Sequence, residues 1–187
     1  VGITAHEATI TLRISAWADN LEACKKKIIA TEHMIREKLG QLVYGEEDDE
    51  VEDAAASAII AASASLASIE AGTAGRVAAL FAQAADRRQA GSQPFFCGGL
   101  VLPELPRGQP QLIEAAKDVA RSHNASIGLA VGPVRPIGTR QAVDVIVVKD
   151  DSVMAIEHVL GGGGIAMSRA AKSAIDQVRQ MLLEGKS

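Results

Sequence analysis

Apolar and polar residues alternate near the start of the chain and then change their period. Residues 9–15 read Thr-Ile-Thr-Leu-Arg-Ile-Ser, and this alternation predicts a half-buried strand whose inward side chains are Ile10, Leu12 and Ile14. Apolar or small residues then recur every three or four positions, at Leu21, Cys24, Ile28, Thr31, Ile35 and Leu39. This period predicts an amphipathic helix of about five turns. Asp19 or Asn20 is its candidate N-cap, and Gly40 ends it.

Acidic residues separate this beginning from the rest of the chain. Glu46–Glu50 are all carboxylates and predict a solvated hinge, which follows a short strand or extended exit at 42–44. We therefore expect a small α+β segment over residues 1–45 and a larger domain over residues 54–187. Residues 46–53 form the acidic linker and the start of a helix between them.

The second domain begins with helix, strand and helix in succession. Residues 51–64 are mostly Ala and Ile and predict a helix, and Leu66, Ala67 and Ile69 predict a buried strand. The turn Glu70-Ala71-Gly72-Thr73-Ala74-Gly75 follows, and residues 76–85 predict a second helix. An α/β sheet usually presents its site at the carboxyl end of such a strand.

Helices and strands continue to alternate as far as the C-terminus. The pattern predicts a core strand at 95–102, a helix at 111–122, a buried strand at 126–131, a loop rich in proline and glycine at 132–138, hairpin strands at 142–149 and 153–159, a flexible hinge at 161–164 and a final helix at 165–183. Helices alternating with strands, followed by a hairpin, predict an α/β domain: a three-layer α/β/α sandwich with a mixed sheet.

Composition narrows the classes of function. The net charge is −4, the pI is about 5.6, and aromatic residues make up 3% of the chain. These values disfavour a nucleic-acid partner, which needs a basic surface and exposed rings. No apolar run reaches the ~18 residues of a membrane span, so no membrane partner is expected. Cys24 and Cys97 have unrelated contexts and the four histidines are scattered, so we expect no metal, no cofactor and a reduced, cytoplasmic location.

The turn at 70–76 is the first candidate site. A helix N-terminus offers free amides and partial positive charge, so Glu70–Arg76 suits a nucleotide or another anion. Thr73, the only hydroxyl of the turn, is interpreted as the cap of the following helix, with a nucleophile as the second reading. Glu70 is interpreted as a partner of backbone N–H groups, with a general base as the second reading. Arg76 lies where the helix dipole does not favour a cation, which indicates a partner such as Glu70 or an anion.

Other basic and glycine-rich positions are weaker candidates. Lys117, Arg135 and Arg140 could supply counter-charge to a phosphate. Gly161–Gly164 precede a helix and suit either an anion or a plain hinge, and they lack the Lys-Ser/Thr that completes a P-loop.

Several stretches match a known family in order, spacing and character. They are Leu39-Gly40, Val43-Tyr44-Gly45, the acidic run, the turn Glu70–Gly75, and the apolar stretches Phe96–Val101 and Ile127–Val131. Together they resemble the CinA (competence/damage-inducible) family over nearly the whole chain. The resemblance implies a KH-like segment at residues 1–45, a CinA C-terminal domain after it, and a homo-oligomer. Because the chain begins with Val1 and not with Met, the resemblance also implies a longer protein with a further N-terminal domain, like those that bind molybdopterin.

Family members with an intact turn are nicotinamide-nucleotide (NMN) amidohydrolases. The resemblance implies a serine nucleophile in the turn, a tyrosine at the end of the Gly-Gly strand and a lysine just beyond it. Here those positions fall on Ala71, on Pro103, and on or near Gly108. The family's substrate loop is replaced around Gly132 and Arg135, and its Asp-Arg pair falls on Gly164 and Ile165.

We therefore expect a pseudoenzyme: a CinA-type domain without amidohydrolase activity that serves as an interaction, oligomerisation or ligand-binding module. Its candidate ligand contacts are Glu70, Ala71, Gly72, Thr73, Ala74, Gly75, Arg76, Gly132 and Arg135. The alternative is an amidohydrolase of altered chemistry that uses Thr73 or Glu70 on a nicotinamide-nucleotide-like substrate. An RNA-binding KH function is disfavoured, because residues 1–45 contain no Gly-x-x-Gly loop.

Overall fold

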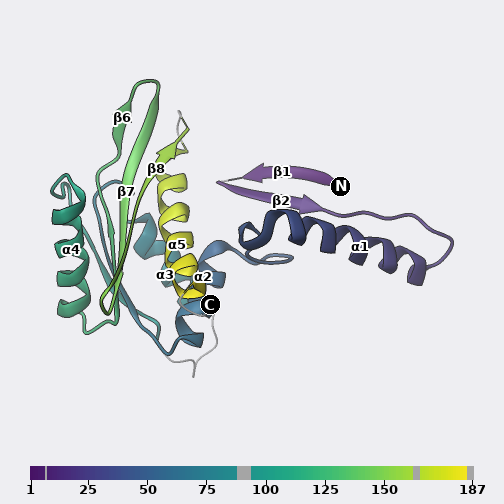
Figure 1. The fold of residues 1–187 in the computed structure, drawn as a ribbon, viewed down its shortest axis with the longest axis horizontal. Coiled ribbons are helices and arrows are strands. Elements are labelled where there is room, and N and C mark those ends of the chain that lie inside the picture. The colour runs from purple at the N-terminus through teal and green to yellow at the C-terminus, as the bar shows by residue number, and fades with distance from the viewer. Residues whose placement is uncertain (7, 88–93, 162–164, 185–187) are drawn as a thin grey trace. The chain divides into compact units, whose positions relative to one another are not determined.

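The chain folds into two compact units, Val1–Glu50 and Val51–Ser187. The computed structural model describes residues 1–6, 8–87, 94–161 and 165–184 (Figure 1). Of the hinge predicted at 161–164, residues 162–164 lie outside this described part. Each unit has its own strands and helices.

The first unit consists of a β-hairpin and a long helix. β1 (Gly2–His6) and β2 (Thr9–Arg13) pair antiparallel, and α1 (Leu21–Leu39) and the 3₁₀ turn η1 (Gly40–Leu42) follow. The predicted helix is confirmed, and the Asn20 side chain caps it by accepting a hydrogen bond from the Ala23 N–H at 2.9 Å. The sequence pattern did not predict β1. Of the two alternatives for residues 42–44, the strand is wrong, since Leu42 ends the 3₁₀ turn, but Val43 has the extended backbone of an exit from it.

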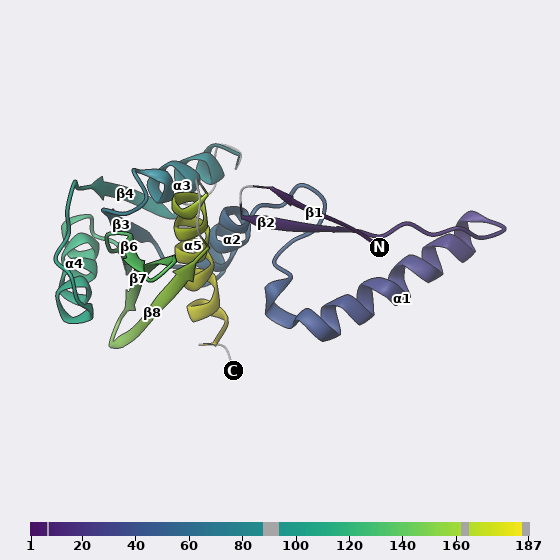
Figure 2. The same cartoon turned by 90° about the horizontal axis from the view of Figure 1, so that it is seen from above.

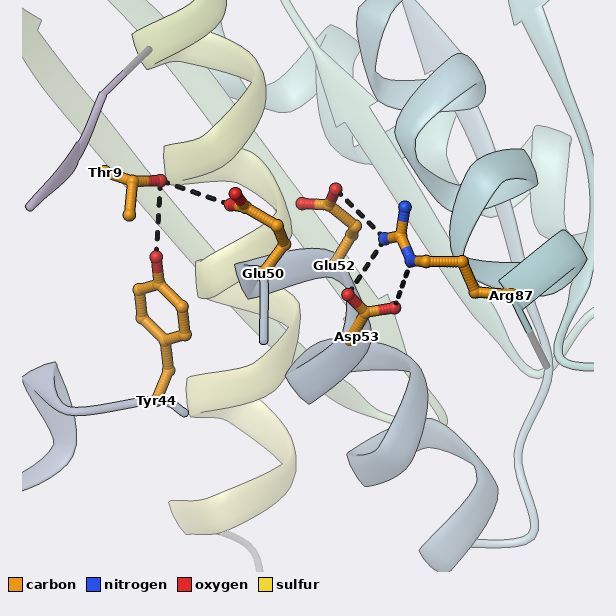
Figure 3. A network of polar contacts seen from close by, with 6 residues as sticks. All are labelled: Thr9, Tyr44, Glu50, Glu52, Asp53 and Arg87. Carbon is orange, nitrogen blue, oxygen red and sulfur yellow. Dashed lines mark hydrogen bonds and ion pairs between the residues drawn. The ribbon is translucent and has the colours of Figure 1, made fainter. Parts of the chain in front are cut away.

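Side chains of the first unit are poorly shielded from solvent. None of its described residues is buried, and Ile10, expected to face inward, is exposed. Two hydrogen bonds tie the hairpin to the end of the unit: the Thr9 hydroxyl donates to Glu50 and accepts from the Tyr44 hydroxyl, both at 3.3 Å (Figure 3). The unit is therefore held by a few polar contacts rather than by a core.

A six-stranded mixed sheet forms the middle layer of the second unit. Its strands are β3 (Leu66–Glu70), β4 (Phe96–Val101), β5 (Ile127–Val131), β6 (Arg135–Ile137), β7 (Arg140–Lys149) and β8 (Ser152–Leu160). β3 runs parallel to β4 and β5 on either side of it, whereas β5, β6 and β8 are antiparallel to β7. The predicted mixed sheet and terminal hairpin are confirmed.

Helices cover both faces of this sheet (Figures 1 and 2). α4 (Gln109–Ser122) packs on one face, and α3 (Arg76–Arg87) and α5 (Ala166–Glu184) pack on the other. α2 (Val51–Ala61) packs against α3 and α5. The predicted three-layer α/β/α architecture is confirmed.

Two local predictions in the second unit are wrong. The predicted core strand at 95–102 is β4, the edge of the sheet, where Leu100 and Val101 are exposed. The predicted loop at 132–138 contains β6, in which Pro136 lies opposite Gln141 of β7. Proline does not end a strand at a short edge segment, because the missing N–H has no ladder partner to lose there.

A buried glutamine fastens α5 to the terminal hairpin. The Gln177 side-chain amide donates to the carbonyl oxygens of Val145 at 3.1 Å and Met154 at 2.9 Å. Its Oε1 lies 2.8 Å from Nε2 of His158. Because that oxygen can only accept, Nε2 of His158 carries a proton.

An ion-pair network joins α2 to α3 within the second unit (Figure 3). The Arg87 guanidinium donates to both carboxylate oxygens of Asp53, at 3.0 and 2.9 Å, and to Glu52 Oε1 at 3.3 Å. The hydrogen bonds to Asp53 raise the pKa of Arg87 above its usual value. The Glu52 side chain is only 3% exposed, so the guanidinium offsets the cost of burying a carboxylate.

Replacing Arg87 by alanine should lower the free energy of unfolding by about 2 kcal/mol, because Glu52 keeps its buried charge without a partner. The Arg87 side chain is 45% exposed, and solvent screening keeps the loss below that of a fully buried pair. Urea unfolding followed by circular dichroism measures the change. The control is Arg121→Ala, which removes an exposed pair with Asp118 and should cost less than ~0.5 kcal/mol. Equal losses in the two variants would contradict the role given to Glu52.

Candidate functional site

The turn between β3 and α3 lies at the carboxyl end of the central strand. Backbone hydrogen bonds hold it on both sides: the Leu102 N–H donates to the Glu70 carbonyl and the Ala71 N–H donates to the Val131 carbonyl, both at 3.0 Å. The ends of β4 and β5 therefore fix where the turn begins. The turn closes with Ala74 and Gly75, both at positive φ.

The Glu70 carboxylate is fully buried and faces the first turn of α3. Its Oε2 accepts from the Val77 N–H at 3.2 Å and its Oε1 accepts from the Ala78 N–H at 3.0 Å. The Thr73 hydroxyl also donates to Oε2. Glu70, rather than Thr73, thus accepts from the helix amides, and an anionic side chain is well suited to that end of the helix dipole.

This cap has a chemical consequence for ligand binding. The amides of Val77 and Ala78 are groups that an anion at this helix end would use, and the Glu70 carboxylate already occupies them. Thr73 is also fully buried. The exposed residues of the turn are Ala74 and Arg76, and the Arg76 guanidinium lies 3.7 Å from the Met167 sulfur.

Ala71 stands at the position where the resemblance implies a nucleophile. It is half-buried and packs against an apolar cluster that includes Leu105, Leu112 and Ile146. Leu105 comes from the proline-rich segment after β4 and is 8% exposed. The segment that was expected to carry catalytic groups thus supplies an apolar side chain to the core beside the turn. In the same segment Pro103 is exposed, and Gly108 precedes α4 with a φ of 117°.

The structure brings the turn and the loop after β5 together. A Cβ on Gly72 would lie 2.5 Å from the Gly132 carbonyl oxygen and 2.7 Å from the Val134 nitrogen. Only a residue without a side chain permits this approach. Gly132 is in turn held by its N–H, which donates to the Asp144 carbonyl at 2.9 Å.

Arg135 follows this loop and is bound to two carboxylates. Asp144 of β7 and Glu157 of β8 lie directly opposite each other in the strand register, an unfavourable arrangement for like charges. The Arg135 guanidinium donates to Glu157 and, at 3.3 Å, to Asp144. The hydrogen bond to Glu157 is the main cause of a raised pKa for Arg135. A phosphate would have to compete with both carboxylates for this guanidinium.

The remaining candidates do not gather at the turn. Lys117 pairs with Glu114 on α4 at 2.9 Å, and Arg140 begins β7. Within the described ranges, no three His, Cys, Asp or Glu side chains are grouped as metal ligands. No helix in that part of the chain combines the length and the hydropathy of a membrane span.

Sequence comparisons give two matches. Residues 1–45 match the family model described as the damage-inducible protein CinA KH domain. A CinA-like protein of Kosmotoga olearia is 27% identical over 206 residues, which cover 96% of this chain and 48% of that protein. The chain thus spans about half the length of the curated relative it matches.

Structure comparisons match CinA proteins in fold. A competence-damaged protein (CinA) superfamily protein from Klebsiella pneumoniae 700603 has a TM-score of 0.60 at 16% identity, covering 74% of this chain and 99% of the other. The competence damage-inducible protein A (ComA) from Klebsiella pneumoniae MGH 78578 has a TM-score of 0.58 at 17% identity, covering 72% and 98%. A competence/damage inducible protein, CihA, from Agrobacterium tumefaciens has a TM-score of 0.53 at 14% identity, covering 76% and 100%.

Proposed function

Because the chain resembles CinA proteins in sequence and fold, we propose that its second unit is a CinA-type domain that has lost amidohydrolase activity. We propose that it now serves as an interaction, oligomerisation or ligand-binding module. The division into a KH-like segment, an acidic linker and this domain, together with a further N-terminal domain in the whole protein, belongs to the same proposal.

One observation carries the proposal most directly. The residue after Glu70 is alanine, whose methyl group has no proton to lose and no lone pair with which to attack an amide. The tyrosine and lysine positions fall on Pro103 and near Gly108, which offer no group to activate a nucleophile or to donate to an oxyanion. Groups that act as a unit in catalysis are here replaced together.

Thr73 and Glu70 favour a second candidate, an amidohydrolase of altered chemistry. A hydroxyl that donates to a carboxylate is the arrangement of a nucleophile and its base. Two facts weigh against it: both side chains are fully buried, and the same carboxylate is already engaged by the amides of Val77 and Ala78. A substrate carbonyl would need a path to a hydroxyl that solvent does not reach.

An assay with NMN tests the proposal. The purified chain should release neither ammonia nor nicotinate mononucleotide above a blank without protein, because residue 71 is alanine and the Thr73 hydroxyl is fully buried. Turnover by the wild-type chain that Thr73→Ala abolishes would establish the altered amidohydrolase. Turnover that survives both Thr73→Ala and Glu70→Gln would overturn both candidates and place the reaction elsewhere in the chain.

If the second unit binds a ligand at the turn, only some residues of the turn are open to it. A ligand at the turn would approach through Ala74, Gly75 and Arg76, since the carboxylate of Glu70 fills the helix end behind them. Gly132 and Arg135 lie on the loop that packs against Gly72 and complete this candidate surface.

A further inference from the structure

The first turns of α3 and α5 meet beside the candidate ligand surface. The two helices lie side by side (Figure 2), and an Arg76 guanidinium nitrogen donates to the Met167 sulfur at 3.7 Å. The first turns of both helices, which belong to the described part of the chain, carry no acidic residue. The Glu70 carboxylate offsets the dipole of α3 from its buried side, so the guanidinium and the start of α5 are the positive groups at this contact.

The sulfur of Met167 is open to an oxidant. The residue is 46% exposed, and exposure is what makes a methionine thioether susceptible to peroxide. Hydrogen peroxide transfers one oxygen atom to the sulfur: a sulfur lone pair forms the S–O bond, the O–O bond breaks, and the second oxygen leaves as water. The sulfur is oxidised by two electrons and the peroxide is reduced by two. The product, methionine sulfoxide, is returned to the thioether by sulfoxide reductases.

Oxidation at this position changes the hydrogen bond that Arg76 can make. A thioether sulfur is a weak acceptor, whereas a sulfoxide oxygen is polar and accepts strongly from a cation. On Met167 that oxygen is attached to the atom that already accepts from the guanidinium, and the residue lies in the first turn of α5, where the dipole favours negative charge. Met181 lies in the last turn of the same helix, where the dipole opposes such an oxygen.

We propose that Met167 is a reversible oxidation site whose sulfoxide fixes Arg76 against α5. The guanidinium is then withdrawn from an anion at the turn, so oxidation by peroxide lowers the affinity for an anionic ligand. This regulatory part rests on the proposed ligand-binding function, in which a ligand approaches through Ala74, Gly75 and Arg76. The oxidation and the new hydrogen bond do not rest on it, because they require only the contact between Arg76 and Met167.

The reactivity of Arg76 tests the new hydrogen bond without any ligand. The full chain is treated with hydrogen peroxide and then with phenylglyoxal, which modifies free guanidinium groups, and both products are located by peptide mass spectrometry. Oxidation of Met167 should slow the modification of Arg76 about fivefold, and sulfoxide reductases should restore it. Arg121, whose side chain is 73% exposed, is the internal control and should react at one rate throughout.

Two substitutions separate the acceptor from other effects of peroxide. Met167→Gln supplies a carbonyl acceptor without an oxidant and should slow the modification of Arg76 as the sulfoxide does. Met167→Leu has a similar volume and no acceptor, so peroxide should leave its Arg76 reactivity unchanged. Met34→Gln is the matched control for the glutamine, because Met34 is 53% exposed but lies on α1, and it should not alter Arg76.

Binding of NMN, measured by calorimetry, tests the regulatory part. Oxidation should raise the dissociation constant of the wild-type chain about fivefold and leave that of Met167→Leu unchanged. A reduced chain that does not bind NMN would overturn the ligand-binding function at the turn and its regulation together, while the phenylglyoxal result still decides the oxidation site.

The opposite results for Arg76 are specific. Equal Arg76 reactivity in the oxidised and reduced wild-type chains would overturn the hydrogen bond to the sulfoxide. A loss of reactivity that persists in oxidised Met167→Leu would assign the effect of peroxide to another residue. NMN binding that oxidation leaves unchanged, in a chain whose Arg76 has become unreactive, would keep the oxidation site and exclude its control of the ligand.

Discussion

Replacing Glu70 by alanine should lower the free energy of unfolding of the second unit by about 3–5 kcal/mol. The substitution leaves the Val77 and Ala78 amides and the Thr73 hydroxyl without their acceptor inside the protein. Each unsatisfied buried group costs about 1–3 kcal/mol, and the helix also loses a charge that its dipole favours. Urea unfolding with a probe of helix content measures the loss.

Glu70→Gln separates the contribution of the carboxylate from that of the side chain's shape. Glutamine keeps the shape and one acceptor oxygen, but its NH₂ group faces donors, so the loss should be about 2 kcal/mol. Glu104→Gln is the control, because Glu104 is exposed, and it should change stability by less than ~0.5 kcal/mol. If Glu70→Gln behaved like this control, the carboxylate would not be the cap of α3, and a catalytic role for Glu70 would regain support.

Gly128→Ala should be at least as damaging, with a loss of more than about 3 kcal/mol or failure to fold. A Cβ at Gly128 of β5 would lie 1.9 Å from the Ala116 carbonyl oxygen of α4 and 3.0 Å from the Val148 side chain. The nearest atom belongs to a helix backbone, so relief requires α4 to move away from the sheet, which opens the core. The thermal midpoint and the yield of folded protein measure the effect.

Gly132→Ala is the matched control for that substitution. Gly132 follows β5, and a Cβ there would meet a Leu112 methyl group at 3.1 Å and the Asp144 carbonyl at 3.4 Å. A side chain can rotate away from such a contact, so the loss should be about 1 kcal/mol or less. A Gly128→Ala variant as stable as Gly132→Ala would mean that α4 does not lie against β5 as closely as the structure has it.

Sequence periodicity predicted those helices and strands that can be identified from their own apolar pattern, without knowing which elements they pack against. The strand at 66–70 and the helices that begin at Val51, Arg76 and Ala166 follow from local apolar patterns. β4 shows the limit of this reasoning. Phe-Cys-Gly-Gly-Leu-Val is as apolar as a central strand, yet it lies at the edge, because a strand's place in a sheet is set by its partners.

The candidate site shows the same limit. The position of the turn was predictable, since a buried strand, a glycine-rich turn and a helix occur in order. The partners of Glu70 were not, because Val77 and Ala78 lie seven and eight residues further on and meet it only once α3 packs on the sheet. Arg135 could have been placed from sequence had β6 been recognised, since two carboxylates facing each other on β7 and β8 call for a nearby cation.

The central place of β3 has a consequence for how the chain is made. β3 leaves the ribosome well before β4 and β5, the strands that pair with it on both sides. During that interval a strand whose residues are all buried in the finished protein has two unpaired edges, the condition under which strands aggregate. Ser68 and Glu70 interrupt its apolar run on the face that later meets α3. Besides capping the helix, the Glu70 charge is therefore expected to oppose aggregation of β3 while the sheet is incomplete.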